Sequence, residues 1–86
     1  MTYGIYSYRD KINGFGMPMI DKNEPSAVRG FSYAVNGKFD LMTFRPSDFD
    51  LYRIGQFDVE TGVIVPELVP VMICSGESVV DNGKIC

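Results

Sequence analysis

Alternating apolar and polar positions at the start of the chain predict two β-strands. Residues 3–9 are aromatic and β-prone, and the Asn13-Gly14 pair after them favours a turn with positive φ. Residues 15–20 predict a second strand, although Pro18 has no backbone donor and should occupy an edge or an unpaired position. The segment therefore predicts a hairpin.

The apolar period changes after residue 20, where the sequence predicts a helix of about three turns. Asn23 can cap the first-turn amides, and Pro25 is tolerated where no intrahelical donor is needed. A stripe that would pack on the sheet follows at helical spacing: Ala27, Val28, Phe31, Ala34 and Val35. Gly37 should end the helix, because glycine adopts the left-handed cap without a Cβ penalty.

The clearest hairpin signal spans residues 48–62. Apolar side chains fall on both sides of its first strand: Leu51 and Phe57 on one, Tyr52 and Ile54 on the other. This pattern predicts a strand covered on both faces, or a bulge at Gly55 that switches the phase. Gly62 can take the positive φ of the loop before the apolar strand 63–65.

The remaining segments connect or extend these elements. Residues 38–47 are too apolar for a free loop, so we expect an ordered connection packed on the core. Two prolines keep residues 66–70 extended, and residues 71–74 predict a possible short extra strand. Residues 75–86 carry turn signals and few core residues. We therefore expect one domain over residues 1–74 and a flexible or partner-ordered C-terminal tail over 75–86.

Together these elements predict a small α+β domain in ββαββ order. Its antiparallel sheet would carry one helix packed on one face, and the open face would be wet and aromatic unless a second subunit covered it. We therefore expect a homodimer. A chain of 86 residues that is 45% hydrophobic supports one small folded domain.

Composition narrows the compartment and the chemistry. No apolar run approaches the roughly 20 residues of a membrane span, and the first residues lack the order of a signal peptide, so we expect no membrane association and a cytosolic protein. Cys74 and Cys86 predict reduced thiols. Two cysteines without a histidine cannot form a zinc site.

Catalytic chemistry is not indicated. The chain has no histidine, which is the commonest general base, and Cys74 is interpreted as a small buried apolar residue. A carboxylate pair or divalent-ion site could be imagined from Asp48, Asp50, Asp58 and Glu60, but acids at strand ends and turns are ordinarily solvated. We expect a non-enzymatic protein with no cofactor, no catalytic residue and no metal.

The charge is unevenly distributed. Residues 1–47 carry six cations against four acids, a net charge of +2, whereas residues 48–86 carry two cations against seven acids, a net charge of −5. Such asymmetry permits a basic surface on a protein whose total charge is −3. A solvated surface of mixed charge remains the alternative.

Aromatic and basic residues coincide on the predicted strands. Sheets that expose aromatic rings beside Lys and Arg bind single strands, because every base offers a face for stacking and the cations follow the phosphates. The candidate contacts to single-stranded DNA are Tyr6, Tyr8, Arg9, Lys11, Arg29 and Arg53, with Tyr3, Phe15 and Tyr52 nearby in the pattern. The alternative is that the alternating tyrosines are half-buried core residues.

Two stretches, MPMIDKNEPSAVRGFSYAVN and RPSDFDLYRIGQFDVETG, resemble the small nonstructural protein of gokushoviruses, which are Microviridae, phages with circular single-stranded DNA genomes. The matching positions are Ala27, Arg29, Phe31, Ala34, Val35, Asn36, Pro46, Asp48, Phe49, Leu51, Tyr52, Ile54, Gly55, Phe57, Asp58, Thr61 and Gly62. The resemblance covers Tyr3 to about Val69. It departs at Gly30, where the family more often has a larger residue.

The resemblance implies a nonstructural bacteriophage protein of the host cell cytoplasm that is absent from the mature virion. It also implies a role in DNA binding, in genome replication or in the switch to genome packaging. The first hypothesis is therefore single-stranded DNA binding. The alternatives are a protein-protein interaction module that binds a phage assembly factor or a host replication protein, and a scaffolding subunit.

Overall fold

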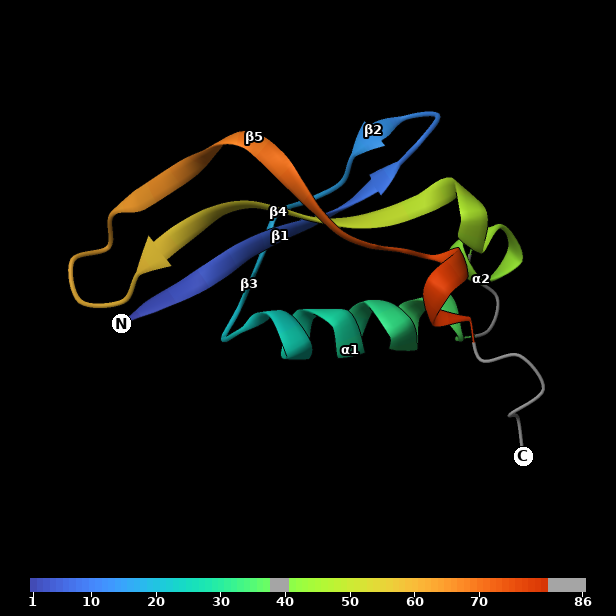
Figure 1. Cartoon of the computed structure of the whole chain (residues 1–86), viewed down its shortest axis with the longest axis horizontal. Coiled ribbons are helices and arrows are strands. Elements are labelled where there is room, and N and C mark those ends of the chain that lie inside the picture. Colours follow the sequence, from blue (N-terminus) through green and yellow to red (C-terminus); the bar gives the residue numbers. More distant parts are fainter. Residues whose placement is uncertain (38–40, 81–86) are drawn as a thin grey trace.

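The chain forms a curled antiparallel sheet with one long helix, α1, along one side of it (Figure 1). The computed structural model describes residues 1–37 and 41–80. Its elements are β1 (Thr2–Asp10), β2 (Gly14–Phe15), β3 (Met19–Asp21), α1 (Glu24–Val35), α2 (Leu41–Phe44), the 3₁₀ turn η1 (Pro46–Asp48), β4 (Phe49–Asp58), β5 (Ile64–Ser75) and the 3₁₀ turn η2 (Glu77–Val79). The predicted α+β class with one main helix on the sheet is confirmed.

Strand β1 lies inside the sheet. It pairs with β4 on one side and with both β2 and β3 on the other, and β5 is the outermost strand beyond β4. Pro18 separates β2 from β3, so the predicted second strand forms as two short pieces with the proline unpaired between them. Gly14 has a φ of 96°, as predicted for the turn that joins β1 to β2.

Of the two alternatives that the sequence offers for this strand, the bulge at Gly55 is the one present. The register of β4 shifts beside this glycine, both against β1 and against β5. Arg53 and Gly55 are paired with successive residues of β1, so Ile54 between them is the extra residue of the bulge. A Cβ at Gly55 would lie 2.9 Å from the carbonyl oxygen of Val65. The glycine therefore permits the close approach of β5 at the point where the strand changes phase.

Strand β5 runs through both prolines, so residues 71–74 are strand as expected but belong to β5 instead of forming a separate short strand. Gly55 of β4 is paired with Pro66, whereas Arg53 is paired with Val71. Residues 67–70 therefore bulge opposite Ile54. A single long strand tolerates these prolines because its outer edge has no neighbour within the described chain to which an N–H must be donated.

Helix α1 begins as predicted and ends differently. The Asn23 side chain accepts a hydrogen bond from the Ser26 N–H at 2.9 Å. The C-cap is Asn36, with φ −96° and ψ 9°, and positive φ among the described glycines occurs at Gly14 and Gly62 instead of Gly37. The Asn36 Nδ2 donates to the Ser32 and Val79 carbonyls, each at 2.8 Å, so the last turn is closed without a left-handed residue.

The core lies between α1 and the sheet. Its fully buried centre is Phe31 against Leu51, and the buried residues around them are Tyr6, Ala27, Val35, Met42 and Phe49. Met42 belongs to the predicted ordered connection, which forms α2 and η1 over residues 41–48 but packs on the core less than expected, because Leu41 and Phe44 are exposed. Residues 38–40 of this connection lie outside the described residues.

The first part of the predicted C-terminal tail packs on this core. Gly76 is buried, and Val79 and Val80 contact the core cluster. The N–H of Gly76 also donates to the Phe49 carbonyl at 2.7 Å. Residues 75–80 are thus part of the folded structure, and residues 81–86 of the predicted tail lie outside the described residues.

Two exposed carboxylates hold the hairpin turns and make stability sensitive to acid. Asp10 accepts the Ile12 N–H at 2.9 Å, and Asp58 accepts those of Glu60 and Thr61 at 2.8 and 3.2 Å. These bonds lower the pKa of both carboxyls below the ordinary 3.8. The stability that they contribute is present above the unfolded-state pKa and is lost as the pH falls through the folded-state pKa.

We therefore expect the urea midpoint to fall as the pH is lowered below about 4, where these carboxyls take up protons. A variant carrying both Asp10→Asn and Asp58→Asn should lose less stability over the same interval, because neither side chain can then be protonated. Urea titrations followed by circular dichroism at several pH values measure this. An equally steep acid dependence in both proteins would contradict the assignment.

Candidate nucleic-acid interface

The sheet face opposite α1 brings together Arg9, Phe15 and Tyr52, which we call the sheet patch. Phe15 of β2 is paired with Arg9 of β1, and the Arg9 guanidinium carbon lies 5.9 Å from the Phe15 ring centroid. The Phe15 and Tyr52 rings meet edge to face, with centroids 5.3 Å apart. Three strands thus contribute one cation and two rings to one surface.

Strand alternation explains which β1 residues reach this face. Tyr8 packs against Phe31 of α1, so its neighbour Arg9 projects from the opposite side of the sheet. The β1–β2 turn is anchored to η1: the Lys11 N–H donates to the Asp48 carbonyl at 2.9 Å, and its Nζ donates to the Ser47 carbonyl at 2.7 Å. Lys11 is exposed and places a second cation in the turn next to Arg9.

The patch has the chemistry of a stacking platform. Phe15 is 46% exposed, and Arg9 and Tyr52 are half-buried. Flat rings bind bases without reading their sequence, and adjacent guanidinium and ammonium groups attract the phosphates between them. Of the candidate contacts predicted from sequence, the structure places Arg9 here, beside the Phe15 ring, and Lys11 in the adjoining turn, where its Nζ donates to the Ser47 carbonyl.

Tyr6 and Tyr8 lie on the helix side of the sheet. For Tyr6, the expectation of an exposed ring that stacks on a base is wrong. It is 3% exposed and belongs to the core, while the Tyr8 ring centroid lies 5.0 Å from that of Phe31. Burial raises the pKa of both phenols, and the Glu24 carboxylate raises that of Tyr6 further. The alternative interpretation of these tyrosines as core residues is the one the structure supports.

Arg53 also faces away from the patch and is held by acids. Its Nε donates to the Glu67 carboxylate at 2.8 Å, and its Nη1 lies 3.7 Å from that of Glu24. The hydrogen bond to Glu67 raises the pKa of Arg53. This half-buried guanidinium joins β4, β5 and the start of α1, so its charge is already neutralised and it is a structural cation.

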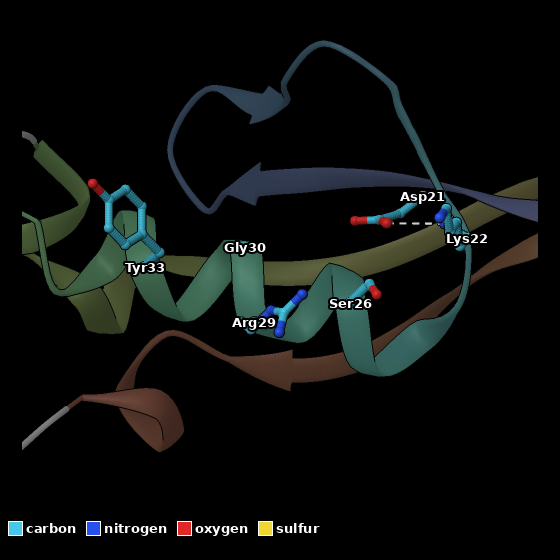
Figure 2. Close-up of a pocket in the computed structure, with 6 residues that line it drawn as sticks. All are labelled: Asp21, Lys22, Ser26, Arg29, Gly30 and Tyr33. Carbon is cyan, nitrogen blue, oxygen red and sulfur yellow. Dashed lines mark hydrogen bonds between the residues drawn. The ribbon is translucent and has the colours of Figure 1, made fainter.

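Arg29 lies apart from the other candidates, on an open groove along α1 with a volume of about 560 Å³ (Figure 2). We call this the helix groove; its lining residues are Asp21, Lys22, Ser26, Arg29, Gly30 and Tyr33. Lys22 and Arg29 are both exposed, and neither forms an ion pair within residues 1–37 and 41–80. Tyr33 is 83% exposed at the end of the groove far from Lys22.

Sequence reasoning missed Lys22 and Tyr33. The apolar stripe of the helix predicts only its buried face. The spacing of Arg29 and Tyr33, four residues apart, places both on one side of a helix and is the signal that could have found the groove.

The acids and the cysteine have structural surroundings. Asp50 is buried and lies opposite Arg9 of β1 and Ser75 of β5 in the sheet register, and its Oδ1 has no hydrogen-bond partner within the described residues. Cys74 is half-buried, and burial raises the pKa of its thiol. In the part of the chain that the structure describes, no group of three potential metal ligands occurs. None of the described helices is long and apolar enough to cross a membrane.

Comparison with known proteins identifies the family. A family model described as "Phage ORF5 protein" matches residues 3–79, which span the elements from β1, except its first residue, to η2. Neither a curated protein nor a solved structure matches the chain. The match covers the strands that form the sheet patch and the helix that carries the groove. The chain therefore belongs to the Phage ORF5 protein family and is a bacteriophage protein.

Proposed function

We propose that this phage protein binds single-stranded DNA without catalysing a reaction, and that it acts in viral genome replication or in the switch to packaging. The observation that carries the proposal is the sheet patch, where two rings lie in contact and a guanidinium lies over one of them. A single strand offers both groups that this surface suits, the base faces and the phosphates. The resemblance to the gokushovirus nonstructural protein supports the same role.

The setting belongs to the proposal as well. We place the protein in the cytoplasm of the infected host, outside the mature virion, as a Microviridae nonstructural protein that forms a homodimer. The acidic total charge of −3 does not oppose DNA binding, because the cations Arg9 and Lys11 are local to the patch.

The test is fluorescence anisotropy with a labelled oligonucleotide and an unlabelled competitor. Replacing Phe15 and Tyr52 together by leucine keeps apolar volume and removes both ring faces. Stacking contributes roughly 1–3 kcal/mol per base, so the double variant should bind at least about tenfold more weakly. Phe44→Leu is the matched control, because Phe44 is an exposed ring on α2.

Salt provides the second measurement. Binding through phosphates must weaken as the salt concentration rises, because each neutralised phosphate releases counterions. Arg9→Gln should reduce that dependence. Absence of binding at micromolar protein, or an affinity that does not change with salt, would overturn the proposal.

A protein-interaction role is the second candidate, and a specific surface favours it. Strand β5 exposes a row of apolar side chains: Ile64, Val65, Leu68, Val69, Val71 and Met72, of which Leu68 is fully exposed. Surfaces of this kind mark contacts with proteins. Pull-down from infected cells separates the candidates. Capture of phage assembly factors or host replication proteins that persists after DNase treatment, by a protein that shows no affinity for DNA, would support this role. Enrichment in procapsids would instead indicate a scaffolding subunit.

A further inference from the structure

We propose that the helix groove is a second contact for the same single strand, which holds one nucleotide with its base over Gly30 and its phosphates on Lys22 and Arg29. This inference rests on the proposed DNA-binding function. The helix groove lies on a different element from the sheet patch, and the ligand that it would hold is one nucleotide of the strand.

Gly30 is the first observation. Glycine inside a helix lowers its stability, and it is normally retained where a neighbouring backbone lies too close for a side chain. No such neighbour exists here: beyond its own helix, a Cβ at Gly30 would meet no atom within 4 Å. Its φ is not positive either. Neither packing nor backbone geometry requires the glycine, and its effect is to leave the floor of the groove open.

The space around Gly30 is consistent with a base placed over this residue in the helix groove. Gly30 lines both the helix groove and a small cavity of about 40 Å³, which is also lined in part by Tyr8, Met19 and Ala27. The helix is therefore incompletely packed at this flank. Tyr33 stands at one end of the groove and can present its ring to a base, because its own ring is not covered (Figure 2).

Charge is the second, independent observation. Two of the described cations outside the groove are already in ion pairs: Arg45 with Asp48, and Arg53 with two glutamates. Lys22 and Arg29 have no such contact in the described chain. One acid, Asp21, faces these two cations, and its Oδ1 accepts the Lys22 N–H at 2.9 Å. The groove thus carries a net charge of +1.

The decisive variants are Gly30→Leu and Gly30→Ala. A Cβ at Gly30 meets no atom within 4 Å, and leucine is a strong helix former, so the protein should be at least as stable to urea as the wild type while its DNA affinity falls about tenfold. Alanine should give the same stability gain with little loss of affinity. Weak binding by a fully folded Gly30→Leu protein cannot be attributed to unfolding.

The charges give a quantitative companion measurement. Replacing Lys22 and Arg29 by glutamine should reduce the slope of log affinity against log salt by about 1.4, since each phosphate contact to a single strand contributes roughly 0.7. Asp21→Asn should act in the opposite direction and strengthen binding, because it removes the one acid while its oxygen can still accept the Lys22 N–H. Arg45→Gln, at an exposed ion pair away from the groove, is the control.

The results separate this inference from the function on which it rests. If Gly30→Leu and the Lys22/Arg29 double variant bind with wild-type affinity and salt slope while the sheet-patch variants are weakened, the second contact is disproved and DNA binding stands. If the wild-type protein binds no single-stranded DNA, both fail. If only the groove variants weaken binding, the groove is supported and the sheet patch is not the interface.

Discussion

Replacing Phe31 by alanine should remove most of the stability of the fold. Phe31 has no exposed surface, and it contacts Tyr8 while lying in the same core cluster as Leu51. Truncating a buried phenylalanine costs about 3–5 kcal/mol, through lost burial and the cavity that remains. A domain of this size has a free energy of unfolding of roughly 4–13 kcal/mol, so the variant should unfold in far less urea than the wild type.

Urea unfolding followed by circular dichroism measures the effect. Phe31→Leu keeps much of the apolar volume and should lose clearly less stability, whereas Tyr33→Ala, on the exposed side of the same helix, should change the free energy of unfolding by less than about 0.5 kcal/mol. A loss below about 1 kcal/mol for Phe31→Ala would show that the packing of α1 on the sheet does not depend on this ring.

The second large effect is expected at Gly76. Its backbone has φ −61° and ψ −35°, so any residue could adopt its conformation. The obstacle is space, because a Cβ would overlap the Pro46 carbonyl oxygen and lie 2.9 Å from that of Phe49. Both are backbone atoms and cannot rotate away. Gly76→Ala should therefore cost about 3 kcal/mol, at the upper end for overpacked sites.

Gly30→Ala is the matched control, since it makes the same chemical change at a helical glycine with open surroundings. Thermal or urea unfolding should separate the two variants by roughly 3–4 kcal/mol, with Gly30→Ala at or above wild-type stability. Hydrogen exchange at Gly76, whose N–H bonds to the Phe49 carbonyl, should report the local displacement. Equal stability of the two alanine variants would show that residues 75–80 do not pack as described.

Periodicity was sufficient to predict β1, β4 and the helix, and to offer the bulge at Gly55 as one of two alternatives, because each depends on residues close together in the chain. The alternation in β1 shows that Tyr8 and Arg9 face opposite ways, but it does not show which face the helix covers. That choice depends on the contact of α1 with the sheet through Phe31. The same limit made Tyr6 a candidate DNA contact when its ring is a core residue.

The candidate interface depended on long-range register. Phe15 and Tyr52 are far apart in the sequence, and their rings meet because β2 and β4 both flank β1 with particular pairs opposite each other. Register of this kind is determined by turn length and packing, which short-range patterns do not encode. The prolines of β5 misled the prediction for a related reason, because proline is compatible with a strand when its position faces an edge.

The bulge in β5 also limits how this protein can polymerise. An unpaired outer strand with exposed apolar side chains would ordinarily recruit further strands into an endless sheet. Pro66 and Pro70 offer no N–H to an incoming chain, and the residues between them leave the regular ladder. A second copy or another protein that docks at this edge must therefore use side chains such as Leu68 and Val69 instead of a continuous ladder of backbone hydrogen bonds.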